Sequence, residues 1–175
     1  MNIKTFTIAR SIAFLFALAI FLSTFASCKK SNDSGAPANT VSATLTAPTG
    51  VTTFTSASTF GYHYKASGEY WLEAAQVAKG DSLLFDFTFY DTVVVNKPYL
   101  ITEAAAGDVT VTLIKWNSHA IYAPDYFSPV GTLTVTSMNQ TNHTIAGTFS
   151  GKFFASASDS VVISNGKFNI TCLEQ

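Results

Sequence analysis

The sequence predicts an all-β domain, an antiparallel β-sandwich of about nine short strands. Apolar and polar residues alternate with a period of two over most of the chain after residue 40. Glycine, asparagine and aspartate turns interrupt this alternation roughly every ten residues, and the alternating segments are rich in Val, Thr, Phe and Tyr. Ten of the 15 Phe residues lie after residue 40, mostly on single faces of these segments, and would supply the core. A closed up-and-down β-barrel is the alternative architecture.

Residues 1–27 have the pattern of an export signal. Lys4 and Arg10 precede an apolar run at 11–25, which is too short and too poorly flanked to predict a membrane span. Small residues and Cys28 follow this run. The arrangement resembles a bacterial lipoprotein signal, in which Cys28 becomes the first residue of the mature chain and is acylated, for example with palmitate. An ordinary secretory signal that happens to be followed by a cysteine is the alternative.

Residues 28–40 predict a flexible, lipidated tether ahead of a domain at 41–175, because they are small and polar and show no periodicity. A lipid anchor predicts a location in the cell envelope, at the outer membrane. Lys29 and Lys30 stand where lipoproteins exported to the cell surface often carry an acidic cluster. The sequence therefore leaves the periplasmic face and the cell surface both open.

The composition of the mature chain excludes several classes of function. Its 148 residues are enough for one domain with a core. Without Lys4 and Arg10 it has 8 Lys, no Arg and 11 acidic residues, a formal charge of −3. With no basic stripe, nucleic acid is not expected as a partner. Cys28 and Cys172 are the two cysteines, so a lipidated Cys28 leaves no disulfide and no cysteine-based metal site.

The strand pattern is clearest at 82–90, where Leu83, Phe85, Phe87 and Phe89 alternate with more polar residues. The segment at 70–78 has residues that favour a helix, but it is short and bracketed by turns, so we predict a strand. A long aromatic loop is expected at 117–130. The other clear strands lie at 41–47, 60–64, 99–102, 109–116, 133–135, 145–155 and 161–172, with weaker ones at 51–56 and 93–95.

Residues 144–172 predict a hairpin, with its turn at 156–159. In the first strand the residues that share the apolar face include Ile145, Phe149 and Phe153. In the second strand an Asn-Gly pair interrupts the alternation. The residues expected to face the core there are Val161, Ile163, Phe168, Ile170 and Cys172. Cys172 is accordingly expected to be a buried, unreactive thiol.

Four segments together resemble an uncharacterised family of Bacteroidota lipoproteins, an all-β domain of unknown function with a "GTF…NGxF" hairpin at its end. The segments are Tyr99-Leu100-Ile101, residues 131–136, residues 145–150 with Gly-Thr-Phe, and residues 162–168 with Asn-Gly-Lys-Phe. The resemblance covers residues 41–171. It implies a lipid-anchored β domain in a Gram-negative envelope, and it implies no activity for any residue.

The sequence contains no recognisable catalytic or metal-binding motif, and we expect neither an enzyme nor a cofactor. His63, His119 and His143 are far apart and lack metal-ligand spacing. Ser150 lies in no nucleophile elbow and is expected to point outward from a strand. The acidic residues that could converge into a hydrolytic site are Glu69, Glu73, Asp86 and Asp91. Solvated positions on the surface are the default expectation for them.

The aromatic loop is the best candidate for a binding site. The residues expected to form it are Trp116, Asn117, Tyr122, Asp125, Tyr126 and Phe127. Aromatic rings with nearby amides and carboxylates suit sugars and protein partners alike. The alternative is that the loop folds back as a lid on one end of the sandwich. Three Asp-Ser/Thr-aliphatic tripeptides at strand ends also resemble O-glycosylation acceptors of Bacteroidota, with Ser82, Thr92 and Ser160 as the modified residues.

Three functions follow from these patterns. The first is a non-enzymatic binding or accessory module, anchored to the membrane by lipid, for a glycan or an envelope protein. The second is a purely structural envelope protein, and the third is a hydrolase with an unconventional carboxylate site. An exposed aromatic shelf would favour the first function, a closed surface the second, and a converging acidic pair in a cleft the third.

Overall fold

The computed structural model describes residues 38–78, 81–90, 93–102, 109–115, 120–123 and 131–175. These residues belong to one compact unit, Gly35–Gln175. All of their regular secondary structure is β-strand. Among the described residues no helix is long and apolar enough to cross a membrane. The prediction of an all-β domain is confirmed.

The described residues form twelve strands in a single sheet. Their bounds are β1 (Thr40–Ala47), β2 (Gly50–Thr55), β3 (Ser58–Tyr64), β4 (Glu69–Ala78), β5 (Asp81–Phe89), β6 (Pro98–Ile101), β7 (Val109–Lys115), β8 (Ala120–Tyr122), β9 (Gly131–Asn139), β10 (Thr144–Phe154), β11 (Ser160–Thr171) and β12 (Leu173–Glu174). The order in the sheet is β12-β3-β4-β5-β7-β6-β9-β10-β11-β1-β2, with β8 paired to β7. The pairs β12–β3 and β6–β7 are parallel, and the others are antiparallel.

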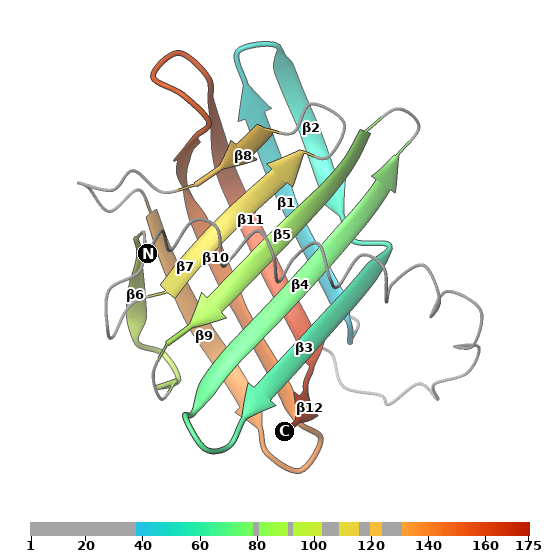
Figure 1. Ribbon diagram of the computed structural model, residues 1–175, viewed down its shortest axis with the longest axis vertical. Helices are drawn as coiled ribbons and strands as arrows, with labels where there is room; N and C mark the ends of the chain where they lie inside the picture. Colours follow the sequence, from blue (N-terminus) through green and yellow to red (C-terminus); the bar gives the residue numbers. More distant parts are fainter. Residues whose placement is uncertain (1–37, 79–80, 91–92, 103–108, 116–119, 124–130) are drawn as a thin grey trace, which may run out of the picture. The chain divides into compact units, whose positions relative to one another are not determined.

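The sheet folds over on itself into two layers. Strands β3, β4, β5 and β7 lie in front of β9, β10, β11, β1 and β2, and the strands of the two layers cross (Figure 1). The path through the sheet ends at β12 on one side and at β2 on the other, so the sheet stays open. The sandwich-like prediction is confirmed, whereas the alternative of a closed barrel is wrong.

Most expected strands are present, including β4, where propensity alone would favour a helix. One expectation fails, because Val93–Val95 forms no strand. The Val94 N–H instead donates a hydrogen bond to the Tyr99 hydroxyl, at 2.6 Å, and Asn96 has a left-handed φ of 64°. This geometry turns the chain before β6 and prevents pairing. Two short strands were not expected: β8 lies within the predicted aromatic loop, and β12 extends the sheet beside β3.

The core is aromatic and joins the two layers. Phe85 and Phe87 on β5 and Phe149 on β10 are each at most 3% exposed. The Phe149 ring centroid lies 5.3 Å from that of Phe85 and 5.0 Å from that of Phe87, both in edge-on geometry. Such edge-to-face contacts are the favoured arrangement of aromatic pairs. The expectation that these three rings share one core is confirmed.

Strand β11 keeps both of its halves facing the core by a β-bulge. Core residues occupy odd positions up to Ile163 and even positions from Phe168 onward, which a regular strand cannot accommodate. The register shifts by one extra residue on β11 between the pairs Gly151–Ile163 and Phe149–Gly166. Asn165, inside this shift, has φ 53°. Asparagine tolerates that left-handed conformation better than most residues, so it suits the bulge.

Two glycines on the β10–β11 hairpin leave room for rings on the opposite strand. Gly147 pairs with Phe168, and Gly166 pairs with Phe149. A Cβ added at Gly147 would lie 2.5 Å from Cζ of Phe168, and one at Gly166 would lie 2.7 Å from Cδ1 of Phe149. Both distances are closer than any side-chain contact allows. The nearest atoms are backbone oxygens, of Thr134 for Gly147 and of Phe149 for Gly166, so both positions require glycine.

Replacing Phe149 by Ala should remove the ring that connects the two layers. We expect the free energy of unfolding to fall by about 3–5 kcal/mol, the usual cost of truncating a fully buried Phe. Chemical denaturation monitored by fluorescence measures this change. The neighbouring Thr148→Ala, at an exposed position, is the control and should change stability by less than about 0.5 kcal/mol. Equal effects of the two variants would show that the faces of β10 are misassigned.

Candidate functional site

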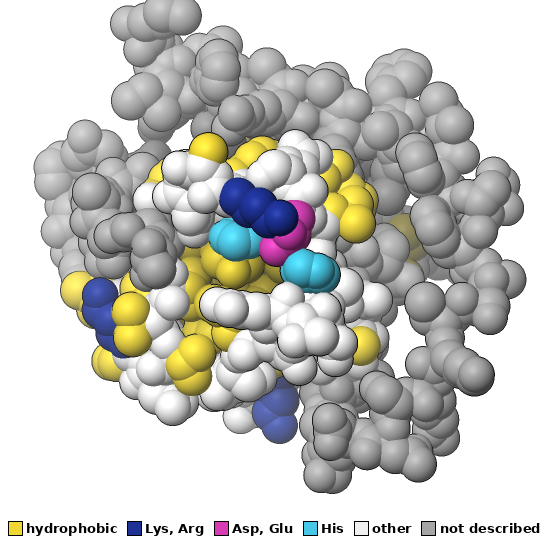
Figure 2. All heavy atoms as spheres, turned by 90° about the horizontal axis from the view of Figure 1, so that it is seen from below, with side chains coloured by type: hydrophobic (Ala, Val, Ile, Leu, Met, Phe, Trp, Pro, Cys, Tyr) yellow, Lys and Arg dark blue, Asp and Glu magenta, His cyan; other side chains and the backbone are white. Residues whose placement is uncertain are grey.

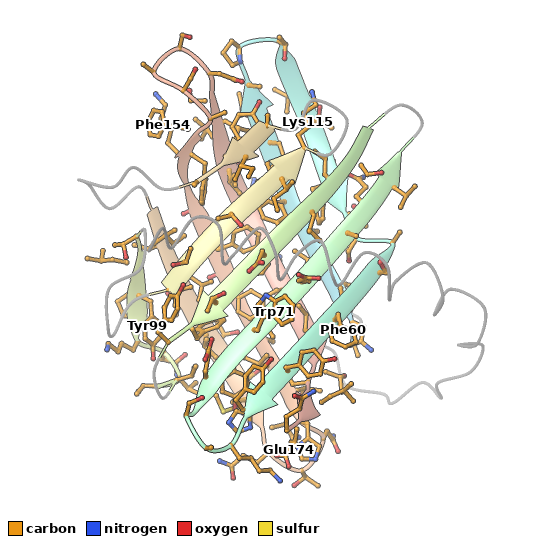
Figure 3. The ribbon with its side chains drawn as sticks, viewed as in Figure 1. Phe60, Trp71, Tyr99, Lys115, Phe154 and Glu174 are labelled. Carbon is orange, nitrogen blue, oxygen red and sulfur yellow. The ribbon has the colours of Figure 1, made fainter. Side chains whose placement is uncertain are left out.

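The face of β3, β4 and β5 that points away from the core carries aromatic and acidic side chains. Successive side chains of a strand point to opposite faces, so residues alternating with the core residues gather there. We call the set formed by these side chains the aromatic–carboxylate face. Its members are Phe60, Tyr62, Tyr64, Trp71, Glu73 and Asp86. Phe60 and Trp71 are labelled on β3 and β4 in Figure 3.

Register brings the members of this face together across the strands. Phe60 on β3 pairs with Glu73 on β4, and Glu73 pairs with Asp86 on β5. One row further along, Tyr62 pairs with Trp71. Directly opposite residues have Cβ atoms about 4.5–5.5 Å apart. The two carboxyl groups are therefore neighbours, and aromatic rings flank them.

The rings of the face form a continuous, half-buried strip. Tyr62 stacks on Trp71 with ring centroids 6.0 Å apart and an interplanar angle of 17°. Phe60 meets Tyr62 edge-on at 4.5 Å, and Tyr64 lies 6.0 Å from Tyr62 on the other side. Mutual contact fixes the positions of the rings before any ligand arrives, which lowers the entropic cost of binding.

Glu73 and Asp86 are the two buried acidic residues among the described part of the chain, with 6% and 8% of their surface exposed. Burial raises the pKa of Glu73 to about 8, and the charge of Asp86 adds to that rise. Burial also raises the pKa of Asp86, to about 6, although hydrogen bonds from Trp71 and Thr88 oppose the shift. Both carboxyl groups therefore keep their protons to a higher pH than free side chains do, and Glu73 does so more strongly than Asp86.

Hydrogen bonding within the pair is incomplete. The Thr88 hydroxyl donates to Oδ1 of Asp86 at 3.4 Å. Oε1 of Glu73 is buried and has no hydrogen-bond partner among the described residues. An unsatisfied buried polar atom costs about 1–3 kcal/mol, so a partner supplied from outside would be stabilising.

The outward face of the other layer has a different chemistry. Strands β1, β9 and β10 present hydroxyl groups and one lysine there. These side chains are Ser42, Thr44, Thr46, Thr132, Thr134, Thr136, Thr148, Ser150 and Lys152, all half-buried or exposed. An ordinary solvated sheet face has this composition, so the aromatic–carboxylate face is the exception that calls for a functional explanation.

A pocket of about 280 Å³ opens at one end of the sandwich. We call it the end pocket. Side chains of β3, β4, β9, β10 and β12, together with the β9–β10 turn, surround it. Figure 2 shows this end of the molecule, with a hydrophobic floor visible between His, Glu and Lys side chains at the rim. The lining residues are His63, Tyr70, Met138, Asn139, Gln140, His143, Thr144, Cys172 and Glu174.

Glu174 is the centre of the rim of the end pocket. Its Oε1 lies 3.0 Å from Nδ1 of His143 and 3.9 Å from Nδ1 of His63, and its Oε2 pairs with Lys65. The hydrogen bond from Lys65 is the main cause that lowers the pKa of Glu174. These contacts tie the last strand to β3 and to the β9–β10 turn.

The end pocket lies at the end of the domain where β1 begins. The Thr171 N–H donates to Oδ1 of Asn39 at 2.9 Å, directly before β1. One residue further on, the Cys172 N–H donates to the His143 carbonyl at 2.7 Å. The tether expected at residues 28–40 therefore joins the domain beside the pocket.

The structure describes one residue of the predicted loop site, Tyr122 on β8. Tyr122 packs against the core, and its hydroxyl donates to the carboxylate of Asp159 at 3.1 Å. Tyr122 therefore holds β8 against the β10–β11 turn. The other members of the predicted site lie outside the described residues: Trp116, Asn117, Asp125, Tyr126 and Phe127.

The predicted modification sites are described in part. Ser82 and Ser160 are half-buried at the beginnings of β5 and β11, as expected for strand ends. Thr92 and the lipidation site Cys28 lie outside the described residues. Lipidation and O-glycosylation stay predictions. Cys172 is 3% exposed, and burial raises the pKa of its thiol to about 12, so the expected inward register is confirmed.

The structure brings together residues that the sequence left apart. Glu73 and Asp86 were expected on the solvated surface, and that expectation is wrong because both are buried. Glu69 lies at the beginning of β4, outside the pair, and Asp91 is outside the described residues. His63 and His143 meet at Glu174 although 80 positions separate them. No spacing motif could reveal that meeting, because the sheet topology creates it.

No group of three His, Cys, Asp or Glu side chains within the described ranges is arranged to hold a metal ion. Comparison of the chain with protein-family models, with curated proteins and with solved structures found no match in any of the three. The resemblance to a Bacteroidota lipoprotein family therefore stays a prediction. The function has to be argued from the two sites themselves.

The acidic pair should make the domain less stable as the pH rises. Both pKa values are raised on folding, so the folded state binds more protons than the unfolded state from about pH 4 to about pH 8. The stability that these bound protons give the folded state is fully present below about pH 4. It is lost as the pH rises from about 4 to about 8. Glu73→Gln removes one titrating group and should increase the free energy of unfolding at pH 8 by roughly 1–3 kcal/mol.

Denaturant unfolding of the wild type and Glu73→Gln at pH 5 and pH 8 measures this effect. Glu69→Gln, on the same strand but outside the pair, is the control and should leave the pH dependence unchanged. A wild type that is equally stable at both pH values would contradict the raised pKa of Glu73.

Proposed function

We propose that the protein is a lipid-anchored module of the cell envelope that binds a neutral glycan through the aromatic–carboxylate face, without catalysing a reaction. The observation that carries this proposal is the strip of contacting aromatic rings beside a buried carboxyl pair. Sugar rings present an apolar C–H face to aromatic rings and hydroxyl groups to polar neighbours. The face offers partners for both.

The aromatic strip supports stacking on more than one sugar unit. The three contacts among Phe60, Tyr62, Tyr64 and Trp71 extend along β3 and onto β4. A well-placed ring contact is worth on the order of 1 kcal/mol, so a single sugar would bind weakly and an oligosaccharide better. We therefore expect a chain of several sugar units rather than a monosaccharide.

The carboxyl pair supports recognition of hydroxyl groups. Because its pKa is the higher of the two, Glu73 is the carboxyl group that can donate a hydrogen bond when protonated, and Asp86 is the better acceptor of the pair. Hydrogen bonds to a charged group are worth about 1.5–3 kcal/mol, so these contacts would set the orientation of the glycan.

Charge supports a neutral glycan over an anionic one. Strands β3, β4 and β5 contain no Lys or Arg, and the face itself carries a carboxylate. A uronic acid or sulfated sugar would be repelled by Asp86 and would find no guanidinium fork. Neutral hexose or pentose polymers fit this charge distribution.

A glycoside hydrolase is the second candidate function, and the different pKa values of Glu73 and Asp86 favour it. Glycosidases use one protonated and one ionised carboxyl group, which are about 5–5.5 Å apart in retaining enzymes. Directly opposite residues on paired strands lie in a comparable range. Binding needs only the stacking and hydrogen bonding described above. Hydrolysis also needs the scissile bond to lie between the two carboxyl groups.

The test is a neutral-glycan array followed by calorimetric titration of the best oligosaccharide. Tyr62→Ala combined with Trp71→Ala should weaken binding at least about tenfold, since about 1.4 kcal/mol of stacking corresponds to that factor. Thr148→Ala combined with Lys152→Ala, on the other layer, is the matched control and should bind as the wild type does. Circular dichroism verifies that each variant is folded.

Three results separate the possibilities. Unchanged binding by the folded double variant would contradict the site. Should that variant unfold, the milder Tyr64→Ala must still weaken binding for the site to stand. Release of new reducing ends by the wild type but not by Glu73→Gln would replace the binding function by the hydrolase.

The lipid anchor has its own test. Cys28→Ala removes the acylated residue, so the protein should accumulate unprocessed or be released without lipid. Metabolic labelling with a fatty-acid analogue and detergent phase partitioning measure this, with Cys172→Ala as the control that keeps the label. A Cys28→Ala protein that still matures and enters the detergent phase would contradict the anchor.

A further inference from the structure

The end pocket is separate from the aromatic–carboxylate face, because it lies at an end of the sandwich and is lined by the inward-facing residues of β3 and β4. We propose that it binds a second, small ligand: a neutral molecule with an apolar body and one hydroxyl or N–H group. The inference does not depend on glycan binding, since the two sites share no residue.

The floor of the pocket requires an apolar ligand body. The Tyr70 ring stacks on His63 at 4.3 Å with an interplanar angle of 10°, and its hydroxyl already donates to Sδ of Met138 at 3.6 Å. Cys172 adds a buried thiol that stays protonated. Ring, thioether and thiol are polarisable and uncharged, which suits an aromatic ring.

The rim of the pocket disfavours a charged ligand. Lys65 and Glu174 neutralise each other in an ion pair. His143 and His63 both direct Nδ1 at the same oxygen of Glu174, at 3.0 Å and 3.9 Å. An anionic ligand would have to displace Glu174 from its partners, and a cationic one would have to displace Lys65. A neutral ligand can bind without displacing either Glu174 or Lys65.

His143 supplies the hydrogen-bond acceptor. Its Nδ1 lies 3.0 Å from the Glu174 carboxylate, so an N–H at Nδ1 can donate to that group and Nε2 is the ring nitrogen left to accept a hydrogen bond from a ligand. His63, at 3.9 Å, is beyond hydrogen-bond distance from the same oxygen. An acceptor at the rim above an apolar floor selects an apolar molecule that carries a hydrogen-bond donor.

The size of the pocket limits the ligand further. Its 280 Å³ is at the lower end of the roughly 300–1,000 Å³ typical of ligand pockets. A molecule of one or two rings, such as a phenol or an indole, fits that volume. With so few atoms, we expect a dissociation constant of about 0.1–1 mM.

The experiment uses the mature chain, residues 28–175, labelled with 13C-methyl methionine, and follows its methyl signal by NMR. Met138 is the single methionine of these residues, and Met138→Leu verifies the signal by its loss. 2-Naphthol is the probe, and 2-naphthoate, with the same rings and a negative charge, is its matched control. We expect 2-naphthol to shift the Met138 signal saturably, with 2-naphthoate binding at least about tenfold more weakly.

His143→Asn tests the acceptor. Asparagine suits this position because His143 has φ 51°, a left-handed conformation that Asn tolerates. The variant should bind 2-naphthol about three- to tenfold more weakly, the loss expected for one hydrogen bond. Ser150→Ala, at an exposed position of β10 outside both sites, should bind the probe as the wild type does.

Each contrary result overturns a defined part of the inference. A Met138 signal that 2-naphthol does not move up to its solubility limit would exclude the pocket as a binding site. Equal affinity for 2-naphthoate would exclude the neutral ligand class. Wild-type affinity in His143→Asn would exclude His143 as the acceptor. Since the glycan titration uses other variants and another ligand, its failure would be recognised independently.

Discussion

The reciprocal glycine–phenylalanine pairs of the β10–β11 hairpin are the contacts on which the two layers depend. Each ring packs against a glycine of the opposite strand, which lets Phe149 and Phe168 lie close to the sheet. Phe87 and Phe89 of the front layer then meet Phe168 at 5.7 Å and 6.5 Å. An open sheet has no closing strand pair to fix its layers. The aromatic core must therefore determine how the sheet folds over.

Alternation in the sequence predicts most strands and their inward faces because a half-buried strand obeys a period of two. The sequence also indicates the β11 bulge, because the core positions change from odd to even residue numbers around Asn165. Short elements are different. Strands β8 and β12 have too few residues to show a period, and they exist through pairing with β7 and β3. Val93–Val95 has the right composition for a strand but a turn before β6 excludes pairing.

The two sites were harder to predict, since each depends on register or topology. Alternation places Glu73 and Asp86 on the outward side of their strands, but only the register between β4 and β5 makes them opposite neighbours. Their depth of burial could not be inferred from the sequence either. His63, His143 and Glu174 come from three distant segments whose meeting follows from the parallel pairing of β12 with β3. Local spacing contains no signal of that kind.

The position at which β1 begins affects how a ligand would reach the end pocket. Asn39 and Thr171 place the start of β1 beside the pocket. A chain from Cys28 to Thr40 spans at most about 40 Å when fully extended. With Cys28 acylated as proposed, the start of β1 could therefore lie at most about that distance from the bilayer surface. A small apolar molecule dissolved in the membrane would then cross only a thin layer of water to reach its site, and lengthening the tether would slow that transfer.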